Sequence, residues 1–132
     1  MRTQRYAVQS SVSGSQAPRA AVVGIAVSDS FEIVFDTLGS SRKADNLRSN
    51  SRIAFVLGGL VGGDERTVQY EGIADEPSSD EGDRIREVYF NAFPEGRDRL
   101  SRPGVTHFRT RPQWLRYSDY NHNPPIIVEF TF

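Results

Sequence analysis

The sequence predicts a mainly β (α+β) protein, an antiparallel barrel or sandwich with one short and one longer helix. About seven runs of β-type residues follow one another along the chain, and brief turns rich in glycine, proline and serine separate them. Only two segments carry a helical pattern. No internal repeat, low-complexity run or linker interrupts the 132 residues, so we expect one domain spanning residues 1–132.

The first half of the chain contains four predicted strands and the short helix. Residues 6–12 alternate weakly, and "GSQAP" then predicts a turn. Residues 19–27, "RAAVVGIAV", are nearly all apolar, which is typical of a strand covered on both faces. The segment "FEIVFDT" alternates, and the short polar helix separates it from a buried strand over residues 53–57.

The second half begins with a glycine-rich hairpin connection, "GGLVGGDE", and a long strand, "RTVQYEGIADE". The longer helix follows. Ser78 precedes Glu81 by three residues, which predicts a capping box, and apolar residues then recur at helical spacing: Ile85, Val88, Tyr89 and Ala92. Pro94 ends the helix, because the residue before a proline disfavours the α conformation.

The chain closes with two further predicted strands. "VTHFRTRPQWLRYSD" contains Pro112, which predicts an edge position or a bulge. In "IIVEFTF" every second residue is apolar, which places one row on a single face: Ile126, Val128, Phe130 and Phe132. We expect this row to be packed, for instance against a partner subunit.

Composition excludes several classes of function. The net charge is −1, so no global basic field attracts nucleic acid or an anionic membrane. There is no cysteine, which excludes disulfides, thiolate metal sites and cysteine nucleophiles. The start of the sequence lacks an apolar signal core, and the longest apolar stretch is too short to span a bilayer. We expect a cytoplasmic protein.

Two cations at the start of the short helix indicate an anion site. Arg42 and Lys43 fall in the first helical turn, where the helix dipole disfavours positive charge. A bound anion reverses this penalty, and the free N–H groups of the helix start point at the same place. Ser40 and Ser41 can cap the helix, and Thr37 can add a hydroxyl. Arginine offers a planar fork for phosphate and lysine a point charge, so the pattern predicts a phosphate site.

These residues belong to a longer pattern. "FDTLGSSRKADNLRSNSRIAFVLGG" followed by "RTVQYEGIA" resembles the pyridoxamine 5′-phosphate oxidase-like, FMN-binding split β-barrels. In that family a Ser-Arg-Lys triplet opens a short helix after a strand end, and a strand ending in Glu-Gly comes later. The resemblance extends over nearly the whole chain and implies an antiparallel split β-barrel that forms homodimers, with FMN at the subunit interface.

The resemblance implies particular contacts. Arg42 and Lys43 match the cations that hold the FMN phosphate, with Ser41 beside them, and Asp36 and Thr37 match a strand-end pair that contacts the flavin. The strand backbone at residues 19–23, which includes Ala21, Val22 and Val23, matches the segment that lines the flavin ring. Thr67 stands where the oxidases place a glutamine. Candidates for completing the site from the partner subunit are Trp114, Arg116 and Tyr117.

The departures from the family pattern concern the substrate. The oxidases have a lysine that meets the pyridoxal substrate where Gly24 stands, and an arginine that binds the substrate phosphate where Phe93 stands. A buried phosphate dianion without its cations is prohibitively unfavourable. We therefore do not expect oxidation of pyridoxamine phosphate. A metal site and a hydrolase triad have no support either, because His107 and His122 lie apart from suitable partners.

The sequence thus predicts an FMN-binding homodimer, with a flavin-dependent oxidoreductase acting on a small unidentified substrate as the preferred function. No side chain is assigned a catalytic role, since the flavin carries the hydride chemistry. Three alternatives stay open. The first is a non-catalytic flavin reservoir, sensor or stress protein, the second is a deazaflavin or haem on the same fold, and the third is a structural dimer without a cofactor.

Overall fold

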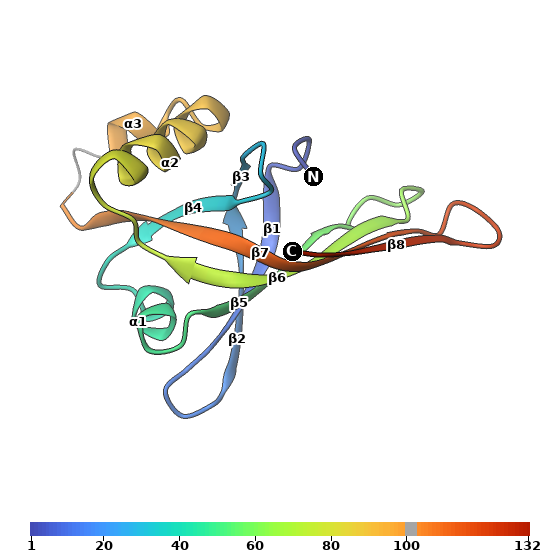
Figure 1. Cartoon of the computed structure of the whole chain (residues 1–132), viewed down its shortest axis with the longest axis horizontal. Helices are drawn as coiled ribbons and strands as arrows, with labels where there is room; N and C mark the ends of the chain where they lie inside the picture. Colours follow the sequence, from blue (N-terminus) through green and yellow to red (C-terminus); the bar gives the residue numbers. More distant parts are fainter. Residues whose placement is uncertain (100–102) are drawn as a thin grey trace.

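One curled antiparallel sheet organises the chain (Figure 1). The structure, a computed structural model, describes residues 1–99 and 103–132. Within them the sheet runs in the order β2-β1-β5-β6-β7-β4-β3. Strand β8 pairs with residues 114–119 of β7, beyond the part of β7 that pairs with β4. The strands are β1 Tyr6–Val12, β2 Pro18–Gly24, β3 Ala26–Val27, β4 Ile33–Leu38, β5 Arg52–Gly58, β6 Arg66–Asp75, β7 Val105–Asp119 and β8 Ile126–Thr131.

Three helices accompany the sheet in the described part of the chain: α1 Arg42–Ser49, α2 Ser79–Ala92 and α3 Gly96–Arg99. Helix α1 packs against β1, β4 and β6, while α2 packs against β3, β4 and β7, so the two helices lie at separate places on the sheet (Figure 1). The four-residue α3 was not expected. None of the described helices has the length and apolarity needed to cross a membrane.

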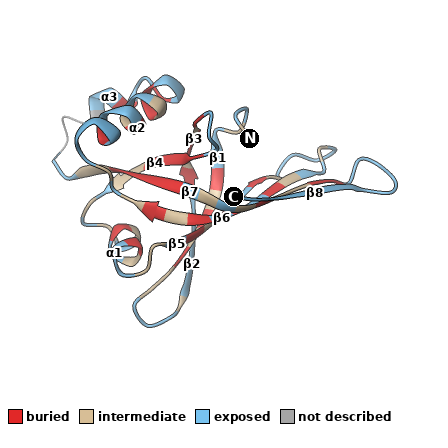
Figure 2. Cartoon of the chain, in the orientation of Figure 1, coloured by how far each residue is buried: buried red, intermediate tan, exposed pale blue. Residues whose placement is uncertain are grey.

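The core lies inside the curl of the sheet. Large aromatic side chains from four different strands meet there: Phe35, Phe55, Tyr70 and Phe108. Phe35 and Phe108 stack with ring centroids 5.7 Å apart, as the cross-strand partners that they are in β4 and β7. Figure 2 shows this buried centre on the middle strands, with exposed residues toward the hairpin ends. Burial of these aromatics closes the curl and fixes the position of α1 beside it.

Most local expectations for the strands are confirmed. Strand β1 has the predicted bounds, and its alternation places every second residue in the buried face. The pairing of β6 with β7 shifts register between Glu71 and Gly72, where Pro112 lies opposite, so the proline sits at a bulge as predicted. The β5–β6 connection is a hairpin loop in which Gly59 and Gly63 adopt positive φ.

The expectation that residues 19–27 form one strand covered on both faces is wrong. The segment breaks at Ile25 into β2 and the short β3, and residues 18–22 of β2 are exposed. Strand β2 is the last strand of the sheet, so only β1 pairs with it. An apolar run does not distinguish a central strand from an edge strand, because burial depends on the neighbours that the fold supplies.

The capping box predicted for α2 is not formed. Ser78 is the N-cap residue, but its side chain makes no capping hydrogen bond. The Glu81 carboxylate instead accepts hydrogen bonds from Arg84 and Arg109. The predicted end of the helix is confirmed, because α2 stops at Ala92 and Phe93 donates its N–H to the Tyr89 carbonyl.

Strand β8 and the β7–β8 turn extend away from the body of the sheet (Figure 1). The predicted apolar row is present in β8, but within one chain it is not packed. Its side chains are exposed by 41 to 56%: Ile126, Val128, Phe130 and Phe132. Only Phe132 contacts another aromatic ring, that of Phe31, at 5.9 Å between centroids.

Candidate functional site

The start of α1 is fixed by hydroxyl groups. The Ser41 Oγ caps the helix by accepting a hydrogen bond from the Ala44 N–H at 3.1 Å. The Thr37 hydroxyl, at the end of β4, lies 3.0 Å from the same Oγ. Strand end and helix start are therefore linked directly, and the next two residues, Arg42 and Lys43, are held in the first helical turn.

A small cavity lies between this helical turn and the β1–β2 hairpin. Its volume is about 160 Å³, and it is lined by Gln9, Ser11, Arg19, Ala20, Ala21, Arg42, Lys43 and Asn46. Gln9 and Ser11 are buried and form the floor, whereas the remaining residues are partly or fully exposed and form the rim. Register explains this arrangement, because Gln9 pairs with Ala21 and Ser11 with Arg19 on the face of the hairpin toward α1.

The cavity is strongly electropositive. Three cations line it, Arg19, Arg42 and Lys43. Lys43 is half-buried, and this burial lowers the pKa of its ammonium, an effect that the nearby Asp36 carboxylate opposes. A lowered lysine pKa indicates that the positive charge is not fully compensated by the protein itself. An anion of two charges in the cavity is therefore electrostatically favoured.

Gln9 lines the cavity and is not among the site residues predicted from the sequence. Its side chain is 2% exposed, and its Nε2 has no hydrogen-bond partner in the part of the chain that the structure describes. The available signal was its place in β1, where Ala7, Gln9 and Ser11 alternate on the buried face. Polar residues on the inner face of a strand normally find partners, so a buried amide without one beside a cavity is notable.

The structure brings some of the predicted flavin contacts together and separates others. Ala21 lines the cavity, whereas Thr37 and Ser41 are not among its lining residues and are hydrogen-bonded to each other beside the start of α1. Val22 faces the opposite side of the hairpin and is 66% exposed, while Val23 is part of the core. Asp36 acts on the cavity through its charge near Lys43.

Thr67 and Trp114 do not reach the cavity within one chain. Thr67 pairs with Gly58 at the end of β6, whereas α1 lies near the other end of that strand. There Thr67 lines a separate cavity together with Tyr117. Trp114 is half-buried opposite Glu71, on the sheet face that also carries Arg116. Their contact with a flavin remains a prediction that involves a second subunit.

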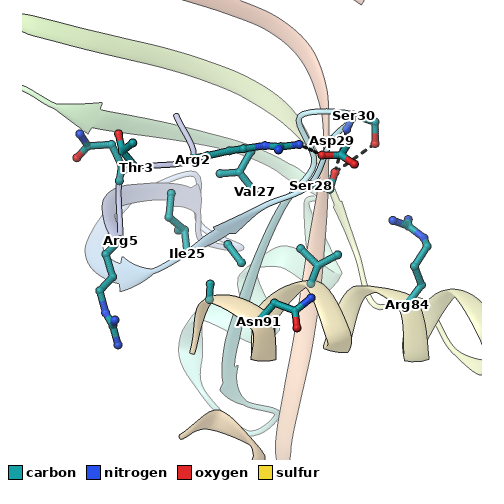
Figure 3. Close-up of a pocket in the computed structure, with 14 residues that line it drawn as sticks. Arg2, Thr3, Arg5, Ile25, Val27, Ser28, Asp29, Ser30, Arg84 and Asn91 are labelled. Atoms are coloured by element: carbon teal, nitrogen blue, oxygen red, sulfur yellow. Dashed lines mark hydrogen bonds and ion pairs between the residues drawn. The ribbon is translucent and has the colours of Figure 1, made fainter. Parts of the chain in front are cut away.

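A larger cavity, about 820 Å³, lies elsewhere, between the N-terminal segment, β3 and α2 (Figure 3). None of the residues predicted for the flavin site lines it. Its arginines already have carboxylate partners: Arg2 pairs with Asp29, Arg5 with Glu95, and Arg84 with Glu32 and Glu81. Because these arginines are neutralised by carboxylates of the same chain, the cavity at the start of α1 attracts an anion more strongly.

The two histidines lie away from both cavities. His107 is buried, and its ring packs edge-on against Tyr89 and Phe90, at 5.1 and 5.5 Å between centroids. His122 lies in the exposed turn before β8, with its Nε2 3.5 Å from Asp119. Neither imidazole faces the cationic cavity.

Comparison with protein families identifies the class. Residues 1–119 match the family model described as pyridoxamine 5′-phosphate oxidase. The chain belongs to this family. No curated protein matches the sequence.

Solved structures show that the fold is the split β-barrel. A haem-binding protein from Mycobacterium smegmatis has a TM-score of 0.83 at 15% identity over 97% of this chain. This chain covers 53% of that protein, about half of its length. A pyridoxamine 5′-phosphate oxidase-related, FMN-binding protein from Nostoc punctiforme has a TM-score of 0.70 at 11% identity, over 97% of this chain and 86% of that one.

HutZ, the haem storage protein from Vibrio cholerae, is also similar. Its TM-score is 0.72 at 14% identity, over 83% of this chain and 82% of that one. Relatives that share this fold thus include proteins named for FMN and proteins named for haem, and the residues of the site must distinguish between the two.

Proposed function

We propose that this protein binds FMN, with the phosphate in the cavity at the start of α1. The observation that carries the proposal is the convergence of three cations, Arg19, Arg42 and Lys43, on one cavity beside the start of α1. Guanidinium, ammonium, hydroxyl and helix N–H groups are the donors that a phosphate monoester requires. The family match supports the same ligand.

The size of the cavity supports a dimeric site. Complete pockets for ligands of this size occupy about 300–1,000 Å³, whereas the cavity measures about 160 Å³. The phosphate fits inside, and the flavin ring lies outside it, along the exposed backbone of β2. We infer that a second copy of the chain covers the ring and contributes Thr67 and Trp114. The exposed row of β8 supplies apolar surface for such an interface.

The proposed activity is flavin-dependent oxidation or reduction of a small substrate. Bound FMN supplies the hydride chemistry. The residues of this chain bind its phosphate, orient the ring along β2 and exclude water where the second copy covers it. Pyridoxamine phosphate is not the proposed substrate, because Gly24 and Phe93 stand where the oxidases have the lysine that meets the substrate and the arginine that binds its phosphate.

Anaerobic stopped-flow spectroscopy of the FMN-loaded protein tests the activity. We expect NAD(P)H to reduce the bound flavin, or a quinone acceptor to reoxidise it, faster than the same reaction of free FMN. Equal rates for bound and free FMN, together with tight binding, would identify a non-catalytic flavin reservoir or sensor instead.

Haem binding is the second candidate, because two of the similar structures are haem proteins. The arrangement of the residues favours FMN. A haem iron needs an axial ligand, and His107 is enclosed by aromatic rings while His122 lies in a turn remote from the cavity. The visible spectrum after addition of FMN or haemin distinguishes the two, since only haem gives an intense Soret band.

A further inference from the structure

We propose that Lys43 is a site of covalent acylation by small acyl phosphates, which bind at Arg19 and Arg42 and transfer their acyl group to the lysine amine. This inference goes beyond the proposed function, because it assigns Lys43 a chemical reaction and not only a contact with FMN. Its basis is the place of Lys43 in the cavity beside α1, the two arginines that line the same cavity, and the presence of a single lysine among the 132 residues.

Lys43 differs in kind from the other strongly basic residues of the chain, which are all arginines. A guanidinium stays protonated throughout the physiological range and is not a nucleophile. A lysine amine becomes nucleophilic once it loses its proton. Amine chemistry of a side chain is therefore confined to one position of this sequence, and that position lines a cavity.

The surroundings of Lys43 favour the neutral amine. The residue is half-buried in the first turn of α1, directly before Ala44, which is fully buried and anchors the helix. Burial lowers the pKa of the Lys43 ammonium, and the charge of Asp36 only partly opposes this effect. Desolvation and neighbouring cations are two means by which proteins activate a lysine as a nucleophile. Lys43 has both, because Arg19 and Arg42 line the same cavity.

The two arginines select the acylating agent. A guanidinium binds phosphate through paired hydrogen bonds, so Arg19 and Arg42 can hold the phosphate of an acyl phosphate and bring its carbonyl carbon to the amine. Both arginines are exposed, so the reagent enters from solvent. The cavity of about 160 Å³ restricts the acyl group to a short chain. An aldehyde without an anionic group gains nothing from these cations, so an acyl phosphate is the better match.

The reaction needs no further reagent. The lone pair of the Lys43 Nζ attacks the carbonyl carbon, a C–N bond forms, and the bond from that carbon to the phosphate oxygen breaks. Inorganic phosphate leaves with the electron pair, the amine releases one proton to water, and nothing is oxidised or reduced. The product is a neutral amide, which removes the positive charge from the cavity at this position. Acylation should therefore prevent FMN binding, and bound FMN should protect Lys43.

Peptide mass spectrometry of the 132-residue chain after incubation with acetyl phosphate at neutral pH measures the acetylation rate of Lys43. We expect this rate to exceed that of Nα-acetyl-lysine amide in the same solution about 10-fold or more, because binding at the arginines makes the transfer effectively intramolecular. Saturating inorganic phosphate should slow the reaction, since it occupies the same arginines. Equal rates for Lys43 and the free model amine would overturn the inference.

Arg42→Gln and Arg19→Gln separate transfer guided by the arginines from general reactivity of the amine. The latter is measured with N-hydroxysuccinimidyl acetate, an acylating agent without a phosphate. The ratio of the acetyl phosphate rate to this rate should fall about 10- to 100-fold in each variant, the range for one hydrogen bond to a charged group. Arg111→Gln, at an exposed arginine outside the cavity, is the matched control and should leave the ratio unchanged. An unchanged ratio in both cavity variants would refute binding at the arginines.

Protection experiments keep this inference apart from the proposed function. FMN should slow acetylation of the wild type, and Lys43→Gln, which imitates the neutral amide, should bind FMN about 10- to 100-fold more weakly. Protection by inorganic phosphate without protection by FMN would keep the acylation site and contradict FMN binding at α1. Acetylation that neither anion slows would overturn the acylation site, whatever titration with FMN shows.

Discussion

The ring of Phe93 fills the space beside Gly24: a Cβ atom placed on Gly24 would lie 2.9 Å from Phe93 Cζ. Phe93 also stacks on Tyr89 at 5.0 Å between centroids, and the Arg5 guanidinium lies over its ring at 4.3 Å. In the family pattern that the chain resembles, these two positions carry a lysine that meets the substrate and an arginine that binds the substrate phosphate. Here the two substitutions fit each other, so an aromatic contact replaces a pair of cations.

This contact predicts that Gly24→Ala destabilises the protein. Phe93 is 3% exposed and held by Tyr89, so its ring cannot move aside freely. Overpacking of this kind costs about 1–3 kcal/mol, which urea unfolding monitored by circular dichroism measures. Gly24→Ala should cost less free energy of unfolding in a Phe93→Leu background than in the wild type, because the added methyl group then no longer meets the Phe93 ring. Strictly additive effects of the two substitutions would contradict direct coupling.

Lys43→Ala should weaken FMN binding by about 1.5–3 kcal/mol, the range for a hydrogen bond to a charged group. The unliganded fold should survive, because Lys43 opposes the helix dipole there and is already partly desolvated. Fluorescence titration and thermal melting measure the two effects separately. Arg111→Ala, at an exposed cation outside the cavity, serves as the control. Unchanged FMN affinity with a collapsed fold would show that Lys43 is structural.

The lowered pKa of Lys43 predicts a pH dependence. Burial disfavours the ammonium more than Asp36 favours it, so folded Lys43 loses its proton below its ordinary value of 10.5. Between the lowered pKa and 10.5 the unfolded chain binds more protons, and the free energy of unfolding of the unliganded protein rises with pH. Phosphate binding needs the charged form, so FMN affinity should fall as pH rises through the lowered pKa.

Lys43→Arg separates this effect from general alkaline instability. A guanidinium stays charged throughout the alkaline range, so the variant should bind FMN with an affinity that is nearly flat above neutral pH. Isothermal titration calorimetry in buffers of different ionisation enthalpy reports the proton uptake directly. An equal alkaline loss of affinity in Lys43→Arg and in the wild type would rule out Lys43 as the titrating group.

A buried charge network predicts sensitivity to acid. Arg109 donates to Asp75 at 2.6 Å and to Glu81 at 2.7 Å, and its Nη1 lies 3.5 Å from Glu32. Burial alone would raise the pKa of Glu32, but hydrogen bonds and charge from Arg84 outweigh it and lower the pKa below 4.5. The stabilising contribution of Glu32 is therefore complete above pH 4.5 and is lost as pH falls through the lowered value.

Arg109→Met removes the central cation of this network and should cost about 1.5–3 kcal/mol, because Asp75 loses both of its hydrogen bonds to Arg109 while Glu32 and Glu81 keep Arg84. The matched control is Arg97→Met, which breaks an exposed ion pair with Glu87 and should cost less than about 1 kcal/mol. Urea unfolding at neutral pH compares the two variants. Similar losses in both would mean that burial does not strengthen the network.

The exposed row of β8 predicts dimerisation. Phe130 is 51% exposed in one chain, and we expect a second copy to cover it. Phe130→Lys should shift the protein from dimer to monomer in analytical ultracentrifugation and weaken FMN binding, since the ring half of the site is then lost. Asp80→Lys, at an exposed residue of α2 away from β8, is the control. A wild-type protein that is monomeric at high micromolar concentration would refute the dimer.

Local sequence features were sufficient to predict most of the secondary structure. The alternation in β1, the N-cap residue before Arg42 and the proline after Phe93 each act within a few residues, so they are visible in the sequence alone. The same holds for the apolar row of β8. The prediction that Arg42 and Lys43 share the first turn of a helix likewise needed only the expected start of that helix, because the dipole acts within the first turn.

Tertiary structure alone decided what surrounds these elements. The exposure of β2 depends on its place at the sheet edge, the place of Gln9 in the cavity lining depends on hairpin register, and the contact of Phe93 with Gly24 joins a helix end to a strand. A local sequence pattern predicts whether a segment forms a strand or a helix. It does not predict which side chains will be buried, because burial depends on neighbours that only folding brings together. For this reason the family and the two helix cations could be predicted from the residues alone, whereas the lining of the cavity required the folded chain.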